Sequence, residues 1–561
     1  MRRIPFAGLS VFRERIMQQP ENRSRKYAHL FTEIDTGRIK IPQFQRDFVW
    51  NKEQTARLID SLIKGFPIGT FIFWKTKESL REVRDIGNIT LPPTPSGEFT
   101  YYVLDGQQRI TSLYAVRKGI RIDRKGKAID YRDIVIDLTS DPDTDEPVVF
   151  SDKPDGHRTI TVHSLLNNSI SDFFDTYKRE ELEKIDVYKK RLEGYDFSVV
   201  EIADYPIDIA CEIFTRINTG GTELTLFEIM VAKTYDVERD FDLAREYQRL
   251  IDNNGAPEKD LEDAGFDTVP SSTVLQCIAV NIGEGRVRRQ DILRISRDDF
   301  IDAWPVVKEG IFQAVDYVRA SLRVPVSRLL PYYALLVPLT YFFVQNEGKS
   351  PTPRQHKLLT QYFWWASLSN RFSSAVESKL FQDRQRMDAI LRGEPPDYRG
   401  EELNLTLDAL RWRWFSTGDA FSMAIACLYA WFQPRSFATD ALVNLDNSWL
   451  KMANSRNYHH FFPKAWLRKQ GFEDWKANSV LNITLVDDYL NKRKIRARAP
   501  GDYMREFAAG NTDLAETMKT HLIDDLEDFG IWDNDYERFI ERRGQRVLEE
   551  LQKRLNPDLQ E

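Results

Sequence analysis

Cysteine is scarce in this sequence of 561 residues. The three cysteines, Cys211, Cys277 and Cys427, lie far apart, and none belongs to a C-x-x-C pair. Such a set supports neither a disulfide framework nor a structural zinc site of the usual kind. We therefore expect a cytoplasmic protein in which His, Asn, Asp or Glu side chains hold any metal.

A signal-peptide core and a membrane-spanning run are also missing. The apolar residues of segment 1–17 are interrupted by Arg13, Glu14 and Arg15, which excludes a secretory signal of the usual form. The longest apolar stretch, Leu329–Val344, contains two prolines and is shorter than the roughly 20 residues that span a bilayer. We interpret it as a pair of buried helices and expect no membrane partner.

The sequence has no Walker motif, G-x-x-x-x-G-K-S/T, which excludes an ordinary P-loop enzyme. It has no excess of positive charge either, because the net charge is −7. That balance excludes a surface that is basic all round, although a local basic channel would be enough to hold a nucleic acid. The chain is too long for one hydrophobic core, and 42% hydrophobic residues can fill two or three.

Strand and helix signals are distributed unevenly and predict an α+β multidomain protein. We expect an N-terminal domain over 1–235, a helical middle domain over 236–435 and a C-terminal domain over 436–561. Runs of β-branched and aromatic residues predict strands at Thr70–Lys75, Thr100–Leu104, Asp133–Leu138 and Phe197–Ile202. Apolar periodicity and capping residues predict helices at Asn51–Lys64, Leu224–Lys233, Pro325–Phe343, Thr352–Leu368 and Ala420–Trp431.

The strongest N-terminal signal is Val103–Thr111, where a predicted strand ends and a helix begins. Gly106 would let the backbone approach a ligand closely, and the helix start offers free N–H groups to an anion. Arg109 could add a bidentate phosphate contact, and Asp105 could orient a metal ion or a water molecule. The alternative is a plain turn that Asp105 caps, with Arg109 at the surface.

Four N-terminal strings form a recurring combination: I-P-x-x-Q-R, P-I-G, D-G-Q-Q-R and F-x-R-I-N-T-G-G-T-x-L. They occupy Ile41–Arg46, Pro67–Gly69, Asp105–Arg109 and Phe214–Leu224. Together they resemble the N-terminal domain of GmrSD-type modification-dependent restriction enzymes. That domain is related to the nucleotide-binding fold of ParB and sulfiredoxin.

This resemblance covers roughly residues 10–235. It implies that the domain binds and hydrolyses a nucleoside triphosphate with magnesium, and it assigns Asp105 and Arg109 to the hydrolytic loop. The residues that it places at the nucleotide are Gln45, Arg46, Asp105, Gly106, Gln107, Gln108, Arg109, Arg216 and Asn218. For Arg216 and Asn218 an equal alternative is a Gly-Gly turn that closes the domain core, with Arg216 paired to an acid.

A polar run interrupts the apolar helices of the middle region at Ser369–Ser374 and is followed by Glu377, Lys379 and Asp383. It resembles a recurring element of the same proteins. We expect it at a seam between domains rather than at a substrate groove. The aromatic run Tyr362–Trp365 could hold a flipped base, but its helical spacing favours a place in the core.

The C-terminal region contains two adjacent histidines, His459 and His460, although the chain has only seven. Pro463, Asn482 and Asn491 follow in that order. An HNH nuclease site combines a metal ligand with a neighbouring general-base histidine, a loop-bracing asparagine and a second ligand from a helix. The string resembles the HNH domain, a ββα-metal fold, that closes GmrSD-type chains, over roughly 440–510.

By this resemblance His460 is the general base, His459 and Asn491 hold a divalent metal, and Asn482 braces the loop. Many HNH sites have Asp where this chain has His459, which leaves Mg, Mn or another transition metal open. The basic tract beside them would bind DNA phosphates without reading sequence, unless it is only a solvated helix face. The tract consists of Lys492, Arg493, Lys494, Arg496 and Arg498, and the predicted DNA contacts are Lys492, Lys494 and Arg496.

Together these features predict a nucleotide-dependent and metal-dependent endonuclease that acts against phage DNA. The resemblance implies modified DNA, with hydroxymethylated or glucosylated cytosine as examples. A homodimer is expected, because one HNH centre cuts one strand. Two alternatives stay open: a nucleotide-gated, ParB-like DNA-binding switch with a degenerate nuclease domain, and an RNase or toxin.

Overall fold

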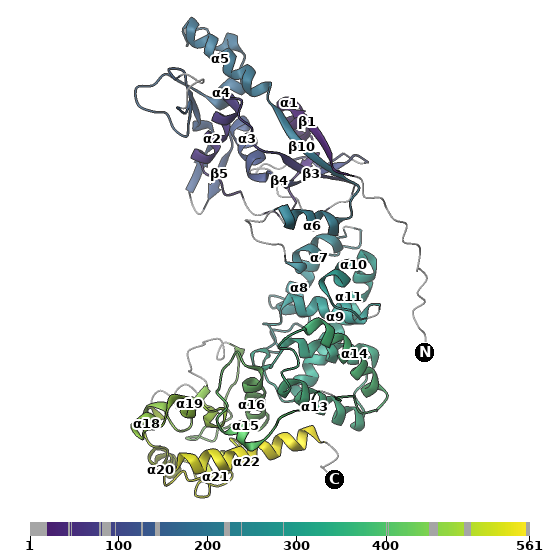
Figure 1. Ribbon diagram of the computed structural model, residues 1–561, viewed down its shortest axis with the longest axis vertical. Helices are drawn as coiled ribbons and strands as arrows, with labels where there is room; N and C mark the ends of the chain where they lie inside the picture. Colours follow the sequence, from purple (N-terminus) through teal and green to yellow (C-terminus); the bar gives the residue numbers. More distant parts are fainter. Residues whose placement is uncertain are drawn as a thin grey trace. The chain divides into compact units, whose positions relative to one another are not determined.

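The computed structural model of this chain describes residues 19–42, 45, 48–77, 80, 91–95, 97–124, 127–140, 146–217, 225–236, 238–283, 285–399, 401, 403–447, 458–486 and 495–556. The chain divides into two compact units, Met1–Asp242 and Leu243–Glu561, which we call the N-terminal and C-terminal units (Figure 1). Both strands and helices are present, so the expectation of an α+β multidomain protein is confirmed. The C-terminal unit contains both the predicted middle domain and the predicted C-terminal domain.

A five-stranded mixed sheet organises the N-terminal unit. Its order is β1 (Glu21–Lys26), β10 (Asp196–Ala203), β3 (Phe71–Thr76), β4 (Thr100–Asp105) and β2 (Ile39–Lys40). β3 pairs parallel with β10 and antiparallel with β4, and β2 joins β4 in parallel. The predicted strands near 70, 100 and 197 are therefore confirmed within one or two residues.

Helices and small sheets surround this sheet, and their apolar faces form one core with it. The helices of this core are α1 (Tyr27–Asp35), α2 (Lys52–Ile63), α3 (Gln107–Lys118), α4 (Val162–Asn167) and α5 (Arg179–Glu193), and α6 (Ile207–Ile217) and α7 (Leu226–Thr234) follow β10 in the chain. The 3-10 turns are η2 (Tyr131–Asp133) and η3 (Ile170–Phe173). The small strands are β5 (Arg121–Arg124), β6 (Lys127–Asp130), β7 (Val135–Asp137), β8 (Val149–Phe150) and β9 (Thr159–Thr161). Asn51 caps α2 in a reciprocal capping box with Gln54, which explains why the predicted helix begins there.

The C-terminal unit is helical. Its helices are α8 (Leu243–Ile251), α9 (Ser271–Asn281), α10 (Arg289–Arg294), α11 (Arg297–Ala320), α12 (Leu336–Gln345), α13 (Pro353–Leu368), α14 (Val376–Leu391), α15 (Leu407–Arg411), α16 (Ala420–Trp431), α18 (Lys464–Lys469), α19 (Asp474–Ala477), α20 (Pro500–Gly510), α21 (Leu514–Lys519) and α22 (Tyr536–Leu555). The 3-10 turns are η4 (Ser327–Leu329), η5 (Tyr333–Leu335) and η6 (Val480–Asn482). The two strands, β11 (Tyr458–His460) and β12 (Ile483–Leu485), pair antiparallel.

The apolar stretch Leu329–Val344 belongs to the core of this unit. It forms the 3-10 turn η5 and most of α12, so it is buried as expected but contains one α-helix instead of the predicted pair, and α12 packs against α9, α11 and α14. The aromatic run Tyr362–Trp365 is fully or almost fully buried in α13, as its spacing predicted. Among the described residues no helix combines the length and the apolar character needed to cross a bilayer.

α22 fixes the strand pair to the helical body. Arg543 is buried in this helix and donates to the carbonyl oxygens of Leu481 and Ile483 at 2.7 Å and of His521 at 3.0 Å. A charged donor that satisfies three backbone acceptors inside a core specifies one arrangement of the segments it joins. The register of β12 is therefore set by α22, some 60 residues further along the chain.

Candidate functional site

The D-G-Q-Q-R string lies where β4 ends and α3 begins, as predicted (Figure 1). Gly106 caps α3 with φ +90°, in the left-handed region that favours glycine. A Cβ at this position would lie 2.3 Å from the ring of Phe71. The turn that presents Asp105 therefore needs glycine for two independent reasons.

The Arg109 side chain connects this turn to the loop that precedes β3. Its Nη2 contacts Asp105 Oδ2 at 2.8 Å and donates to the Thr70 carbonyl at 3.1 Å, and its Nη1 donates to the Ile68 carbonyl at 2.7 Å. Gly69 makes room for the guanidinium, because a Cβ there would lie 2.5 Å from Nη1. The predicted phosphate contact of Arg109 stays a prediction, and in this structure the side chain joins the P-I-G loop to the turn.

Two glutamines make similar connections. Gln45 Nε2 donates to the carbonyl oxygens of Val103 and Leu104, both at 2.9 Å. Gln108 Oε1 accepts from the backbone N–H groups of Val49 at 2.7 Å and Trp50 at 3.2 Å. Three of the four N-terminal motifs thus meet around the start of α3, and their long polar side chains mainly bond the protein's own backbone.

The other residues predicted to contact the nucleotide are Gln107, Arg216, Arg46 and Asn218. Gln107 is buried in the first turn of α3. Arg216 is exposed in α6 and pairs with Glu212 of the same helix at 2.9 Å, which matches the alternative of a cation paired to an acid. Arg46 and Asn218 lie outside the described residues. Among the described residues, the groups of this turn that could meet a ligand include the Asp105 carboxylate, which is 33% exposed and paired with Arg109, and the helix start.

The predicted histidine pair forms the end of β11. His459 pairs with Thr484 and His460 with Ile483 across the two-stranded sheet. Neighbouring residues of a strand point to opposite faces, and accordingly His459 is 5% exposed whereas His460 lines a cavity. The two imidazoles are therefore presented to different surroundings.

The tautomer of His460 follows from its hydrogen bonds. Asn478 Nδ2 donates to the Phe415 carbonyl at 2.8 Å, so Asn478 Oδ1 is the acceptor for His460 Nε2–H at 2.9 Å. The unprotonated nitrogen of the neutral ring is then Nδ1. Burial, reinforced by the charge of Lys464, lowers the His460 pKa to about 4. At neutral pH the ring is uncharged and its Nδ1 can accept a proton.

The turn that follows His460 is held from both sides. Asn482 Oδ1 accepts from the Phe462 N–H at 2.8 Å, and its Nδ2 donates to the carbonyls of Phe462 and Ala477 at 2.9 Å. The Tyr503 hydroxyl donates to the Phe461 carbonyl at 2.5 Å. This is the geometry that a loop-bracing asparagine requires, and it leaves His460 little freedom of orientation.

His460 opens onto a cavity of about 870 Å³ within the C-terminal unit. Lys464, Asn478 and Tyr458 line it from the predicted C-terminal domain. The other lining residues come from the predicted middle domain and include Arg328, Tyr332, Asn370, Ser373, Phe415 and Asp419. The polar run Ser369–Ser374 is predicted at a seam between domains rather than at a substrate groove. Its residues Asn370 and Ser373 lie where the two predicted domains meet, and they also line this cavity.

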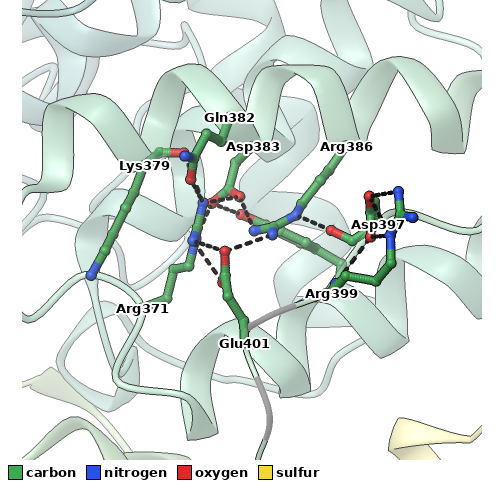
Figure 2. A network of polar contacts seen from close by, with 9 residues as sticks. Arg371, Lys379, Gln382, Asp383, Arg386, Asp397, Arg399 and Glu401 are labelled. Carbon is green, nitrogen blue, oxygen red and sulfur yellow. Dashed lines mark hydrogen bonds and ion pairs between the residues drawn. The ribbon is translucent and has the colours of Figure 1, made fainter.

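A largely buried charge network surrounds Arg371, the residue that follows Asn370 in the chain (Figure 2). Arg371, 3% exposed, bonds both oxygens of Glu401 at 2.7–2.8 Å and Gln382 Oε1 at 2.8 Å. Asp383 lies between Arg371 at 3.0 Å and Arg386 at 2.7 Å, and Arg386 also reaches Glu401 at 3.0 Å. Two cations thus balance two carboxylates, and the turn between Asn370 and Ser373 is anchored to α14.

Of the remaining residues predicted for the C-terminal site, Asn491, Lys492 and Lys494 lie outside the described residues. Arg496 is exposed and has φ +49°, and Arg498 pairs with Glu506 at 2.6 Å. Within the described ranges, no three His, Cys, Asp or Glu side chains gather as a metal centre.

Sequence reasoning missed two elements of the site. Asn478, which fixes His460, is one of several polar residues around an apolar run, and nothing in its spacing distinguishes it. The network around Arg371 could have been suspected, because Glu377, Lys379 and Asp383 follow the polar run, but the partners Arg386 and Glu401 are not marked by the sequence.

Residues 27–235 match the family described as the N-terminal domain of the GmrSD restriction endonuclease. The matched segment runs from α1 to α7 and contains all four motifs named above. It supports a GmrSD-type relationship for this part of the chain, and it suggests a nuclease whose substrate is DNA.

The chain is also similar to an uncharacterized protein of Methanocaldococcus jannaschii. The two are 24% identical over 589 aligned residues, which cover 92% of this chain and 96% of the relative. The similarity therefore includes both the N-terminal and the C-terminal unit.

Proposed function

We propose that this protein is an endonuclease that cuts modified DNA, with hydroxymethylated or glucosylated cytosine as examples, in defence against phage. In this proposal the C-terminal unit is an HNH nuclease and the N-terminal unit a ParB-like nucleotide-hydrolysing switch. The observation that carries the proposal is the fixed tautomer of His460. Its Nε2–H is bonded to Asn478, and its unprotonated Nδ1 belongs to a ring that opens onto a cavity.

His460 would act as the general base. Nδ1 takes a proton from water, the water oxygen attacks the phosphorus, and the bond from phosphorus to the sugar oxygen breaks. The Nε2–H bond to Asn478 keeps the ring oriented as it becomes charged. Lys464 lines the same cavity and offers a positive charge to the phosphate.

The resemblance assigns a divalent metal to His459 and Asn491, although the buried His459 faces the opposite side of β11 from His460. Imidazole nitrogen and amide oxygen both bind divalent cations, so His459 and Asn491 would hold Mg, Mn or another transition metal. When bound, the cation stabilises the charge that develops on the leaving oxygen. Lys492, Lys494 and Arg496 would hold neighbouring phosphates, and a homodimer would cut both strands.

The N-terminal unit would bind a nucleoside triphosphate at the start of α3. Asp105 supplies the carboxylate that Mg²⁺ prefers, and the backbone N–H groups that follow Gly106 suit a phosphate. Arg109, Gln45 and Gln108 then serve as positioning residues, because they hold three segments together around the turn. Nucleotide hydrolysis would license or reset the DNA complex.

The test is a cleavage assay with modified and plain DNA, nucleotide and several metals. His460→Ala should lower cleavage by about 10²–10⁴-fold, the usual contribution of a general base, while DNA binding is kept. Asp105→Ala should abolish nucleotide hydrolysis. Cleavage that survives His460→Ala would overturn the assignment of the base. Nucleotide-gated binding without strand breaks would favour the ParB-like switch, and cleavage confined to RNA would favour an RNase.

A further inference from the structure

We propose that the cavity beside His460 receives one nucleotide of the DNA substrate, turned out of its base stack, with its base against the rings of Tyr332, Tyr333 and Phe415 and within reach of the Asn370 amide. This inference rests on the proposed function, because it assigns a substrate to the same centre. It adds that the enzyme unpairs its target before cutting, and it places recognition of the base in the C-terminal unit.

The first observation that supports this inference is the size of the cavity. A volume of about 870 Å³ lies in the range of roughly 300–1,000 Å³ that is typical of pockets for small ligands. Hydrolysis of a phosphodiester needs only a surface that reaches one phosphate, so a hollow of this size is more than the chemistry of His460 requires. A duplex is too wide to enter such a pocket, whereas one extruded nucleotide is not.

The chemistry of the walls is that of a base pocket. Tyr332, Tyr333 and Phe415 are half-buried and line the cavity, and aromatic rings of this kind stack on any nucleobase. Arg328 and Lys464 add positive charge for the phosphate that remains attached. The long aromatic run Tyr362–Trp365 cannot serve in this way, because it is enclosed in the core.

Polar groups that could read a base edge come from the Asn370–Ser373 turn. The exposed side-chain amide of Asn370 forms no hydrogen bond with any described residue. An amide offers both a donor and an acceptor to a base edge. Ser373 Oγ donates to the Asn370 carbonyl at 2.7 Å, so its lone pairs remain to accept from a base. Asp419 is already engaged by Arg413 and by the start of α16.

The turn is rigid enough for recognition. Ser373 N–H bonds the Asn370 carbonyl at 3.1 Å, and Asn370 has φ +53°, a conformation that Asn tolerates better than most residues. Between these two residues, Arg371 is held in the network of Figure 2. Because the backbone of this turn is held before binding, only the exposed side chain of Asn370 has to be ordered by the base.

The experiment uses 2-aminopurine, a base whose fluorescence rises when it leaves the stack, next to the mapped cleavage position. The full chain is first made inactive by His460→Gln and then bound to the cleavable DNA. Fluorescence should rise several-fold on binding. In the same background Asn370→Gly, which keeps the left-handed backbone, and Tyr332→Leu, which removes a stacking ring, should reduce the rise. Ser374→Ala, on the same turn but outside the cavity, should leave it unchanged.

A second measurement uses the active enzyme. A mismatch at the target base pair should speed cleavage, because it lowers the cost of unpairing. Asn370→Gly should slow cleavage of matched DNA by about threefold to tenfold, as expected for one lost hydrogen bond. If the wild type cuts DNA with no rise in fluorescence and no effect of mismatches, base extrusion is wrong while the endonuclease function stands. If it cuts no DNA at all, the proposed function itself fails.

Discussion

The turn at the start of α3 and the cavity beside His460 are both polar, but they use their polar side chains in opposite ways. At the N-terminal turn Arg109, Gln45 and Gln108 bond backbone groups of their own unit. At the cavity the fixing residues hold the groups that would meet a ligand. Asn478, which itself lines the cavity, and Asn482 hold the histidine and its turn, and Arg371 anchors the turn between Asn370 and Ser373.

This difference teaches how far a motif can be equated with a ligand contact. A dense motif such as D-G-Q-Q-R contains the residues that build a turn as well as those that touch what the turn binds. Within the part of this turn that the structure describes, Asp105 and the helix start are the candidate ligand contacts. In the C-terminal unit the residues that line the cavity are dispersed along the sequence. The histidine pair supplies the side chain proposed to react, His460.

The comparison predicts unequal costs for removing the two arginines. Arg371→Leu leaves Asp383 and Glu401 with only one of their two cations, Arg386, and breaking a buried charge network of this kind costs about 3–5 kcal/mol. Arg109→Leu leaves two carbonyls and a partly exposed carboxylate, which should cost about 1–3 kcal/mol. Denaturant unfolding that resolves the two units would measure both.

The matched control for this pair is Arg399→Leu. Arg399 pairs with Asp397 at 2.7 Å at the edge of the same network, but its side chain is almost fully exposed. This change should have little effect on unfolding. If Arg371→Leu proves no more costly than Arg399→Leu, the buried network does not anchor the cavity wall.

The C-terminal unit should also be the more sensitive to acid. His521 is buried between Thr484 and the Arg435 carbonyl, and burial lowers its pKa to about 3. In the unfolded chain a histidine titrates near pH 6.5, so between about pH 3 and 6.5 the unfolded state binds more protons. Stability is complete above this window and falls by up to about 1.4 kcal/mol per pH unit within it.

Melting temperatures measured from pH 7.5 to 5 would check this expectation. His521→Gln removes the titrating group, so its melting temperature should depend less steeply on pH than that of the wild type. Equal slopes for the two proteins would mean that His521 does not make the unit sensitive to acid.

The smallest expected effect concerns Asn478. Asn478→Leu leaves His460 in place but removes the acceptor for Nε2–H, so the ring can turn and change tautomer. Loss of an orienting partner of this kind typically lowers activity by about 10–100-fold. Cleavage rates at saturating DNA would measure it, with DNA affinity unchanged. An unaltered rate would show that Asn478 does not position the base, and would weaken the contrast between the two sites.

Local features of the sequence determined the elements and the places of the motifs. The capping box at Asn51, the strand runs and the spacing of α13 and α16 depend on residues a few positions apart, which is why they could be predicted. The position of D-G-Q-Q-R between β4 and α3 and the strand-end position of the histidine pair follow from the same local logic.

Only the tertiary structure decided which side chains meet. Gln45 finds carbonyls some 58 positions away, Asn478 reaches His460 across the strand connection, and Glu401 closes the network around Arg371. These pairings depend on how buried polar groups find partners once the apolar faces have packed, and no local pattern encodes that choice. The helical stretch 243–435 and the strand pair became one unit for the same reason, because α22 and Arg543 bind them together.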